Sequence, residues 1–474
     1  MAFGRLVLLA VLALADDAGE AAVRSEGACA SPEPDACIGR PESRFTLAFG
    51  SCHHQAKPAP TLLAAAASAP DVFVFLGDNL YNDVDRWGMP CEPLRCAGRL
   101  RTLTSPLLLG LFKLLPLALK RIVYRAFATR LAGGTLSPPS LEGDGAALAA
   151  HYAALGAKAE VIALRAAVPL ILATWDDHDY GRNDAGAGYA HARESRAEFV
   201  KFWRGRDADD APKPTRGVYA SYTLDGGGGR VVRVILLDLR TYRTAPLRPE
   251  AVPPAQRAAR CAAPDGAASL GEYCTHAPNA TATLLGAEQW AWLEAQLRAP
   301  ADVRLVCSSL AVWSQFHAME AWSLFPGEQR RLVQLLLRTR ADGVVFLSGD
   351  VHYAELSVRK PTQPDTGRPD DLYPLYDLAS SGLNQDWPVA PANSERLAGP
   401  VHEHNWGRVA VDWARRELEL EVRDARGAVA LRHVVSLDAL RFPASARTVG
   451  VTVASHSQLP TAGSEGGSGG AAGE

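Results

Sequence analysis

The sequence lacks a strong charge of either sign, because 49 lysine and arginine residues are nearly balanced by 52 aspartate and glutamate residues. A net charge of −3 creates no field that would recruit nucleic acid or an anionic membrane. The sequence also lacks an apolar run long enough to span a bilayer, because the apolar run over residues 6–15 and the uncharged stretch over residues 102–112 are both too short. No internal repeat is visible either, so a repeat architecture is not expected.

What is present is the composition of a folded protein. The 474 residues are 47% hydrophobic and 21% charged, which is the balance found in globular chains. A chain of this length can bury a large core, either as one large α/β domain or as two domains of ordinary size.

The N-terminus predicts export. A short basic start precedes the apolar run over residues 6–15, which ends in Ala13-Leu14-Ala15 and is followed by two aspartates. This order is typical of a secretory signal peptide with a small-x-small cleavage site. The alternative is an uncleaved anchor, but the run is too short for one. We therefore expect residues 1–15 to be a cleaved signal peptide and the mature protein to be secreted.

The eight cysteines agree with export, because six of them form three locally spaced pairs in loop-like stretches. In an exported chain this spacing predicts disulfide bonds that clip loops, although eight cysteines permit other pairings. The pairs are Cys29 with Cys37, Cys91 with Cys96, and Cys261 with Cys274. Cys307 lies in an apolar run and is expected to be buried. Cys52 lies in a polar cluster and is a candidate metal ligand.

Strand and helix patterns alternate along the chain, which predicts an α/β layer fold. Strands are expected at residues 45–49, 71–76, 169–173, 218–224, 230–237, 303–306, 343–347, 376–379, 407–412, 417–423 and 428–435. Helices are expected at residues 61–68, 146–168, 195–203, 286–298 and 327–339. We expect one domain over residues 44–437, between a disulfide-clipped segment, 16–43, and a mostly disordered tail, 438–474.

A leucine-rich stretch, residues 100–131, interrupts this domain. Two prolines break it, and several basic residues lie among its leucines. We expect a pair of short amphipathic helices that pack on the domain or form a lid. The alternative is a helix that makes weak contact with a membrane surface.

Four strand ends carry residue types that bind metals. The clusters are Phe-Gly-Ser-Cys-His-His at 49–54, Leu-Gly-Asp-Asn-Leu-Tyr at 76–81, Thr-Trp-Asp-Asp-His-Asp at 174–179, and Leu-Ser-Gly-Asp-Val-His-Tyr at 347–353. Open α/β sheets bind ligands at the carboxyl ends of their strands. Any one cluster alone is better explained as a turn with packed side chains. The four together predict a metal-centred hydrolase.

The first two clusters favour a ferric ion. Gly77 allows a sharp turn after its strand, and the Asp78 carboxylate has two oxygens with which to bridge two cations. Tyr81 can direct its phenol to the same point, but a tyrosinate ligand needs a strongly Lewis-acidic ion because its free pKa is about 10. A Cys52 thiolate would add a soft ligand that is compatible with iron.

The other two clusters add oxygen and imidazole ligands. Asp350 and His352 are separated by one residue, so both would face one site if the segment is extended. The third cluster gathers three carboxylates and an imidazole, and like charges this close raise a pKa unless a cation neutralises them. Its paired carboxylates, Asp176 and Asp179, also fit a glycosidase. That alternative gives the other three clusters no role.

In these motifs the chain resembles the PhoD-like alkaline phosphatase and phosphodiesterase family, relatives of purple acid phosphatases among the calcineurin-like metallophosphoesterases. The resemblance covers roughly residues 44–435 in collinear order. Its most specific part is Trp-Asp-Asp-His-Asp-Tyr-Gly, within the matching text Thr174-Trp-Asp-Asp-His-Asp-Tyr-Gly-Arg-Asn-Asp184, and further parts are Val234-Ile-Leu-Leu-Asp238 and Cys307-Ser-Ser309. The resemblance implies a β-sandwich flanked by helices, with a binuclear metal site at the C-terminal ends of its strands.

The resemblance also implies a role for each residue that matches a family motif. The implied ligands of Fe³⁺ are Cys52, Asp78, Tyr81 and His352, with Asp78 bridging to a second ion held by Asp177 and Asp350. His178 would contact the phosphoryl group or the leaving oxygen, and Arg182 would help to bind the anion. Asn79 and Asn183 are further candidate contacts to metal or phosphate.

The second ion is expected to be hard. Purple acid phosphatases supply histidines and an asparagine to their second metal, whereas the matching positions here carry Asp177, Asp350 and the Ser308-Ser309 region. Oxygen ligands favour Ca²⁺, Mg²⁺ or Mn²⁺ over Zn²⁺, and we expect Ca²⁺ first.

Together these features predict a secreted hydrolase of small-molecule or polymeric phosphate esters, in which a metal-activated water attacks phosphorus. The alternative from another class is a catalytically silent, secreted metal- or phosphate-binding protein on the same fold.

Overall fold

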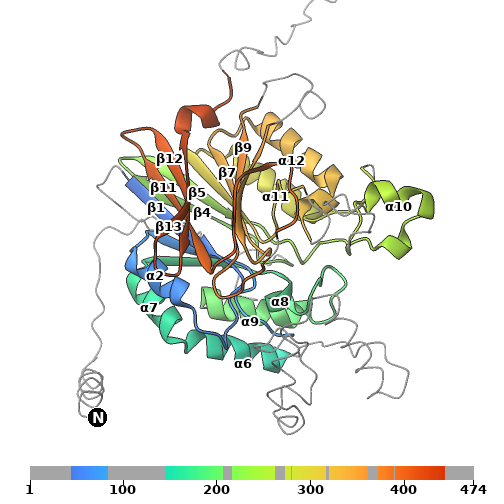
Figure 1. The fold of residues 1–474 in the computed structure, drawn as a ribbon, viewed down its shortest axis with the longest axis horizontal. Helices are drawn as coiled ribbons and strands as arrows, with labels where there is room; N and C mark the ends of the chain where they lie inside the picture. The colour runs from blue at the N-terminus through green and yellow to red at the C-terminus, as the bar shows by residue number, and fades with distance from the viewer. Residues whose placement is uncertain are drawn as a thin grey trace, which may run out of the picture.

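The computed structural model describes residues 44–83, 145–205, 216–261, 273–278, 280–315, 320–360, 372–388 and 390–443. These residues form two mixed β-sheets that pack face to face, with helices on the outer faces (Figure 1). The predicted α/β fold, a β-sandwich flanked by helices, is confirmed. The predictions for residues 1–15, 16–43 and 100–131, for the tail beyond residue 443, and for the pairs Cys29–Cys37 and Cys91–Cys96 lie outside the described residues.

The first sheet has six strands in the order β13-β12-β11-β1-β2-β3. Three strands from the N-terminal part run parallel, and three from the C-terminal part extend the sheet in antiparallel pairing. The strands are β1 (Arg44–Gly50), β2 (Val72–Leu76), β3 (Leu170–Thr174), β11 (Asn405–Asp412), β12 (Glu417–Asp424) and β13 (Val429–Ser436).

The second sheet has seven strands in the order β10-β8-β9-β7-β6-β5-β4. Its strands β5, β6, β7 and β9 run parallel; β4 and β8 pair antiparallel with β5 and β9, and β10 pairs antiparallel with β8. The strands are β4 (Ala220–Gly227), β5 (Arg230–Leu236), β6 (Val303–Ser308), β7 (Val344–Ser348), β8 (Ala354–Arg359), β9 (Leu375–Ser380) and β10 (Arg396–Val401).

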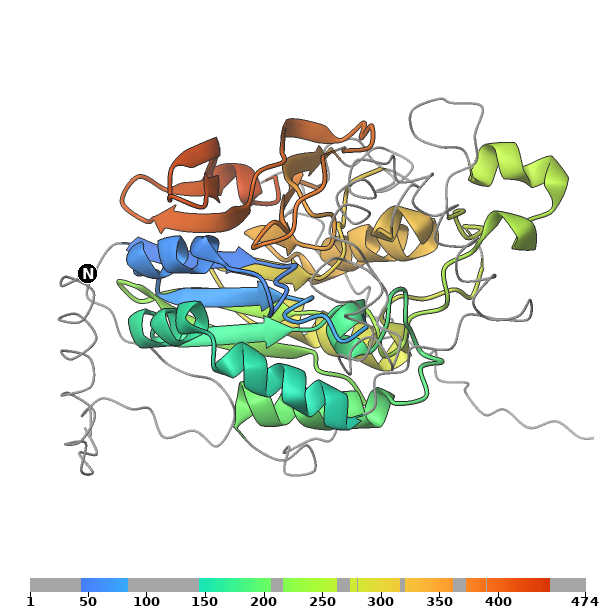
Figure 2. The same ribbon diagram turned by 60° about the horizontal axis from the view of Figure 1, so that its bottom comes forward.

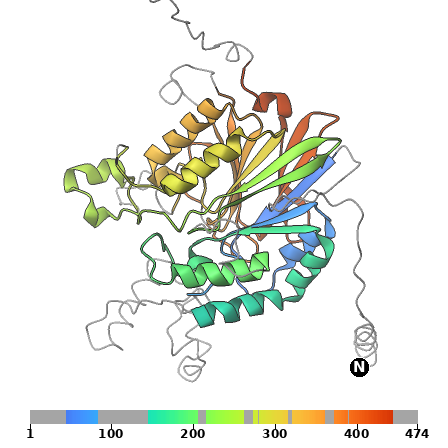
Figure 3. The ribbon, with the colours of Figure 1, turned by 180° about the vertical axis from the view of Figure 1, so that it is seen from behind.

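The helices cover the outer faces of the two sheets. Figure 2 shows α2 (Pro60–Ala67), α6 (Gly145–Gly156), α7 (Ala159–Ala167) and α9 (Ala192–Arg204) grouped on the side of the first sheet. On the other side α11 (Gly286–Arg298) and α12 (Pro326–Thr339) lie next to each other on the second sheet (Figure 3). The short α10 (Pro254–Arg260) projects from the body of the molecule (Figure 1).

Alternation along the buried strands divides the core into two layers. In β2, Val72, Val74 and Leu76 face the core between the sheets, whereas Phe73 and Phe75 face the helices of the first sheet. Successive side chains of a strand point to opposite faces, so a strand buried on both faces is apolar throughout. This is why β2 reads as an uninterrupted apolar run.

The parallel strands of both sheets end at one edge of the sandwich, where their loops are joined. Thr174 Oγ1, at the end of β3, donates to the carbonyl oxygen of Leu237, after β5, at 2.7 Å. The Leu383 amide, after β9, donates to the carbonyl oxygen of Ser51, after β1, at 3.2 Å. Loops from two separate sheets are therefore held together at one edge.

Most predicted elements are present with small shifts at their ends, but two strands were missed. The strand β8 follows the fourth cluster at once, with no turn signal between them. The edge strand β10 contains Gly399 and Pro400, residues that usually argue against a strand, and its pairing with β8 is irregular. Residues 438–443, predicted to lie in the tail, pack on the domain: Leu440 and Phe442 are buried.

The helical structure predicted over residues 146–168 is confirmed, and it consists of two helices, α6 and α7, with a bend of 61° between them. Helix α6 ends at Gly156, and Lys158 is extended, which starts a new helix in another direction. Within the described ranges, no single helix is long and apolar enough to cross a membrane, although this bent pair passes that test by length and composition.

The predicted disulfide bond between Cys261 and Cys274 is confirmed. It connects the end of α10 to a segment whose Cys274 amide donates to the carbonyl oxygen of Leu247 at 2.7 Å. Cys307 is buried and unpaired, as predicted. Cys52 is also a buried free thiol.

Candidate metal centre

Three loops bring the candidate ligands together, and their backbones are strained. Cys52 follows β1, Asp78 follows β2, and Asp350 and His352 follow β7; their φ angles are 61°, 49°, 74° and 56°. A left-handed backbone at a residue other than glycine costs about 1–3 kcal/mol and is concentrated at functional sites. The expected extended conformation of residues 350–352 is therefore wrong. Both side chains reach the centre from left-handed turns.

Gly77 makes the approach of the β2 loop possible. Its φ is 101°, and a Cβ atom at this position would lie 2.6 Å from Cβ of Asp176. Only glycine fits this turn without displacing the third cluster. The Gly77-Asp78 pair thus brings a carboxylate into contact with the loop that carries Asp176 and Asp177.

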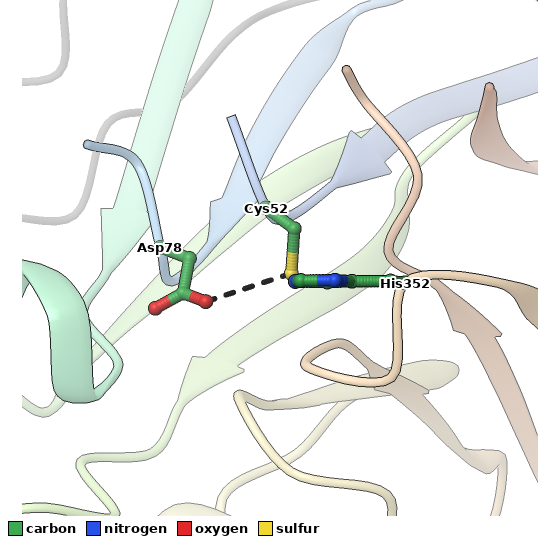
Figure 4. Close-up of side chains that lie close together, drawn as sticks. All are labelled: Cys52, Asp78 and His352. Carbon is green, nitrogen blue, oxygen red and sulfur yellow. Dashed lines mark hydrogen bonds between the residues drawn. The ribbon is translucent and has the colours of Figure 1, made fainter. Parts of the chain in front are cut away.

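The thiol pocket, which we define as Cys52, Tyr81 and His352 around Asp78, brings four different donor types together. Cys52 Sγ lies 3.6 Å from Asp78 Oδ2, and Figure 4 shows the His352 ring beside this contact. The Tyr81 hydroxyl is 3.2 Å from Asp78 Oδ2 and 3.0 Å from His352 Nε2. The donor atoms of Cys52, Asp78 and His352 all lie within 4.8 Å of one another. Sulfur, phenol, imidazole and carboxylate therefore converge on one point.

The walls of the thiol pocket keep water away from these groups. Cys52 is fully buried, and Tyr81 lies between the rings of His54 and His178, at centroid distances of 5.3 and 4.3 Å. Burial, together with the nearby Asp78, raises the pKa of both the Cys52 thiol and the Tyr81 phenol well above their usual values. Both groups would become anionic ligands only beside a strong cation.

His352 already has the protonation state of a ligand. Its withdrawal from water, and the nearby His178, lower the pKa of His352 to about 3. A neutral imidazole offers a lone pair to a metal. The His352 loop is also anchored, because the Trp387 amide donates to the His352 carbonyl oxygen at 2.9 Å.

The carboxylate cluster, which we define as Asp78, Asp176, Asp177 and Asp350, shares Asp78 with the thiol pocket. One oxygen from each of the four lies within 4.8 Å of the others. Burial and the neighbouring carboxylates raise the pKa of Asp78, Asp176 and Asp350. Four carboxylates this close need cations to remain charged.

Asp177 differs from the other members of the cluster. Burial would raise its pKa, but Arg240 and His178 lower it below the usual range. Asp177 Oδ1 accepts from the His178 amide at 3.0 Å, and Asp177 Oδ2 accepts from the Asp184 amide at 2.7 Å. Asp177 is therefore a charged carboxylate held in a fixed orientation.

His178 is oriented by a carboxylate outside the cluster. Its Nδ1 lies 2.5 Å from Asp83 Oδ1, and Asp83 Oδ2 accepts from the Asn183 amide at 2.7 Å. Burial would lower the pKa of His178, but Asp83 and the cluster carboxylates raise it well above its usual value. The pair can therefore hold an imidazolium, and one ring nitrogen of His178 lies within 4.8 Å of oxygens of Asp78 and Asp177.

In the one-turn helix α8 (Asp177–Tyr180), Asp179 has a structural role, because its carboxylate accepts hydrogen bonds from neighbouring residues. Asp179 Oδ1 accepts from the Asp176 amide at 2.6 Å, and Asp179 Oδ2 accepts from Asn79 Nδ2 at 2.6 Å. Both oxygens are engaged and the side chain is fully buried, so the glycosidase alternative lacks its second carboxylate. Asn79 is held by the same contacts, and its buried Oδ1 has no hydrogen-bond partner among the described residues.

Arg182 and Asn183 lie on the loop after α8, outside the groups that could hold a metal. The Arg182 side chain is partly exposed and Asn183 is exposed. The loop itself is fixed, because Asp83 and Asp177 accept from the amides of Asn183 and Asp184. Neither residue belongs to a group of donors that could hold a metal ion in the described part of the chain.

The arginine and the additional acids beside the centre were not predicted from the sequence. Asp176 was assigned only to the rejected glycosidase, and Asp83, Asp184, Arg240 and Glu320 had no role. Arg240 donates to Asp176 Oδ1 at 2.5 Å and to Glu320 Oε2 at 2.6 Å. The sequence did contain a signal for Arg240. This residue comes shortly after a predicted strand, 230–237, as each of the four clusters comes at the end of a predicted strand.

Comparison with known proteins identifies a matching family and similar solved structures. A family model described as PhoD-like phosphatase matches residues 149–431, which include the third and fourth clusters but neither Cys52 nor Asp78. The solved structure of PhoD is similar at 17% identity and a TM-score of 0.53, over 85% of this chain and 72% of that chain. A structure of GAP50, the anchor in the inner membrane complex of Plasmodium, is similar at 10% identity and a TM-score of 0.42, over 84% and 89%. A search of curated proteins found no match.

Proposed function

The chain belongs to the PhoD-like phosphatase family, a family of phosphoesterases, and on that premise we propose that it hydrolyses phosphate esters at a binuclear metal centre. The observation that carries this proposal is the sharing of Asp78 between two unlike groups of donors, the thiol pocket and the carboxylate cluster. A carboxylate common to both can bridge two ions.

The donors of the thiol pocket fit Fe³⁺. Cys52, Tyr81, His352 and Asp78 combine a soft sulfur with a phenol, an imidazole and a carboxylate. A phenol whose pKa is raised by burial ionises only beside a strongly Lewis-acidic ion, which favours Fe³⁺ over the common divalent ions.

The donors of the carboxylate cluster fit a hard divalent ion. Asp78, Asp177 and Asp350 supply oxygen ligands only, and Asp176 adds an Oδ2 atom that is buried without a hydrogen-bond partner among the described residues. An unpartnered buried carboxylate oxygen is costly unless a cation accepts it. Oxygen-only ligation favours Ca²⁺, with Mg²⁺ and Mn²⁺ as alternatives.

When bound, the two ions would activate a water molecule and neutralise charge on the phosphoryl oxygens. His178, held at Nδ1 by Asp83, would donate a proton from Nε2 to the leaving oxygen. Arg182, on the adjacent loop, would bind the phosphate anion. Of the residues around the centre, His178, Asp350 and His352 are partly exposed, so a substrate would enter on this side.

The substrates would be small or polymeric phosphate esters outside the cell. The disulfide bond between Cys261 and Cys274 is consistent with an oxidising compartment. The signal peptide that would direct export, and the stretch 100–131 that would touch a membrane surface weakly, are proposed from the sequence alone.

A direct test is hydrolysis of p-nitrophenyl phosphate and of its bis-ester by the purified protein, with iron and each divalent metal varied. Hydrolysis that is lost on chelation and restored by metals supports the proposal. A protein that binds both metals and hydrolyses neither ester would instead be the catalytically silent metal-binding protein.

A further inference from the structure

Arg240 is wholly buried behind the carboxylate cluster. Its Nε and Nη1 donate to Asp176 and Glu320, and its Nη2 lies 3.8 Å from Asp177 Oδ1. A single guanidinium thus contacts three carboxylates, two of which belong to the cluster. Because Arg240 is buried, its charge has to be balanced by neighbouring acids such as these three.

A second group of acids meets the carboxylate cluster at Asp177. One oxygen each of Asp177, Asp184 and Glu320 lies within 4.8 Å of the others, which is close enough to share a cation. Arginines approach every member of this group: Arg240 lies on Asp177 and Glu320, Arg243 lies on Glu320, and Arg248 lies 3.1 Å from Asp184. Guanidinium groups therefore supply the positive charge that a metal ion could supply here.

The position of Arg240 is fixed by its own part of the sheet. Asp238 Oδ1 accepts from the Arg240 amide at 2.9 Å, and Asp238 Oδ2 accepts from the Val218 amide at 2.9 Å. The Asp238 amide donates to Gln289, on α11, at 2.8 Å. The guanidinium is therefore held by a framework that does not depend on the metal centre.

Arg240 also makes the surroundings of the two Asp176 carboxylate oxygens different. Oδ1 accepts from Arg240 Nε at 2.5 Å and from Ser309 Oγ at 2.6 Å. Oδ2 is buried and has no hydrogen-bond partner in the described part of the chain. With one oxygen fixed from behind, the other is committed to the side where Asp78, Asp177 and Asp350 converge.

We propose that Arg240 is a permanent cation of the centre, a positioning residue that occupies the place of an additional divalent ion beside Asp177 and Glu320 and fixes Asp176 toward the carboxylate cluster. The proposal rests on the proposed function, since it requires a divalent ion in that cluster. It explains why Asp184 and Glu320, which are outside the binuclear ligand set, lie beside the ligand Asp177.

The test is the number of divalent ions bound by the Arg240→Met chain. Methionine keeps much of the volume of arginine and removes its charge. The full chain is stripped with chelator, dialysed against Ca²⁺, and analysed for metal per chain and for melting temperature. We expect Arg240→Met to bind one more Ca²⁺ than the wild type and to melt lower than the wild type in chelator, with Ca²⁺ restoring most of the difference.

Two further variants test whether the additional ion depends on Arg240 and on Glu320. Arg243→Met is the matched control, because Arg243 is equally buried and contacts Glu320, while its described hydrogen bonds and ion pairs do not include Asp176 or Asp177. It should bind as many ions as the wild type. Adding Glu320→Gln to Arg240→Met removes one acid of the second group and should abolish the additional ion.

The outcomes separate the two proposals. A folded Arg240→Met chain with the wild-type ion count overturns the role of Arg240. A chain that does not fold at any Ca²⁺ concentration also overturns it, because a divalent ion then does not replace the guanidinium. A wild-type chain that binds no divalent ion contradicts the proposed function itself, and the role of Arg240 fails with it.

Discussion

The thiol pocket and the carboxylate cluster, the two halves of the centre, differ in how the charge of their buried donors is balanced. The thiol pocket gathers Cys52, Tyr81 and His352 in a buried space with aromatic walls, and no arginine contacts these donors among the described residues. The carboxylate cluster has Arg240 at its back, held by Glu320. The thiol pocket therefore depends on its metal ion to balance the charge of its ligands, whereas the negative charge of the carboxylate cluster is partly balanced by Arg240.

The largest effect is expected where the halves join. Asp78→Asn removes the carboxylate shared by the two groups, so both ions should be lost. Turnover should fall by more than about 100-fold, which exceeds the usual effect of changing a residue that only hydrogen-bonds to a metal ligand. Metal analysis and p-nitrophenyl phosphate hydrolysis measure this. Asp438→Asn, at an exposed ion pair with Arg416, is the control and should change neither. Full activity and metal content in Asp78→Asn would contradict a shared ligand.

A change confined to the thiol pocket should separate the two ions. Cys52→Ser replaces the soft ligand, so iron should be lost while the divalent ion stays, and turnover should fall by about 10- to 100-fold or more. Metal content per chain is the measurement. The matched control is Cys307→Ser, another buried free thiol, which should keep both ions. If Cys52→Ser loses the divalent ion and keeps iron, the assignment of the halves is reversed.

A smaller effect is expected at His178, between the two halves. Asp83→Asn weakens the partner that orients His178, so kcat should fall by about 10- to 100-fold with metal content unchanged. The double variant with His178→Ala should be no slower than His178→Ala alone, because Asp83 acts through that ring. Additive losses in kcat would show that Asp83 acts elsewhere.

The smallest effect is expected behind the carboxylate cluster. Ser309→Ala removes one of the two hydrogen bonds to Asp176 Oδ1 and leaves Arg240 in place, so the affinity for the divalent ion should fall by less than about tenfold. Calcium titration of the chelator-stripped chain measures this. Ser314→Ala, which removes a buried hydrogen bond to Glu355 away from the centre, should leave the affinity unchanged. A loss as large as that of Asp78→Asn would mean that Ser309 itself is a ligand.

Much of this fold could be predicted because local patterns and global packing agree. The helix α11 has the predicted ends, and β2 reads as a buried strand because both of its faces are covered. The break between α6 and α7 could not be predicted from an alanine-rich stretch, in which helix propensity continues across the bend. The edge strand β10 was hidden by its glycine and proline.

The candidate site, like the fold, could be predicted from the sequence only in part. Cys52, Asp78 and His352 could be predicted to meet because each follows a strand that ends at one edge of the sandwich. The left-handed turns at Asp350 and His352 could not, because sequence spacing does not report backbone strain. The position of Arg240 after a strand end was a signal in the sequence, but its contacts with Asp176 and Glu320 depend on the packing of one sheet on the other.

The most direct test of the account is elemental analysis of the purified wild-type chain combined with its visible absorption spectrum. We predict one iron and one hard divalent ion per chain, with a thiolate- or tyrosinate-to-Fe³⁺ band that is lost or shifted in Cys52→Ser and Tyr81→Phe. A chain that binds two ions of the same divalent metal, with no visible band and no change in either variant, would contradict an asymmetric centre.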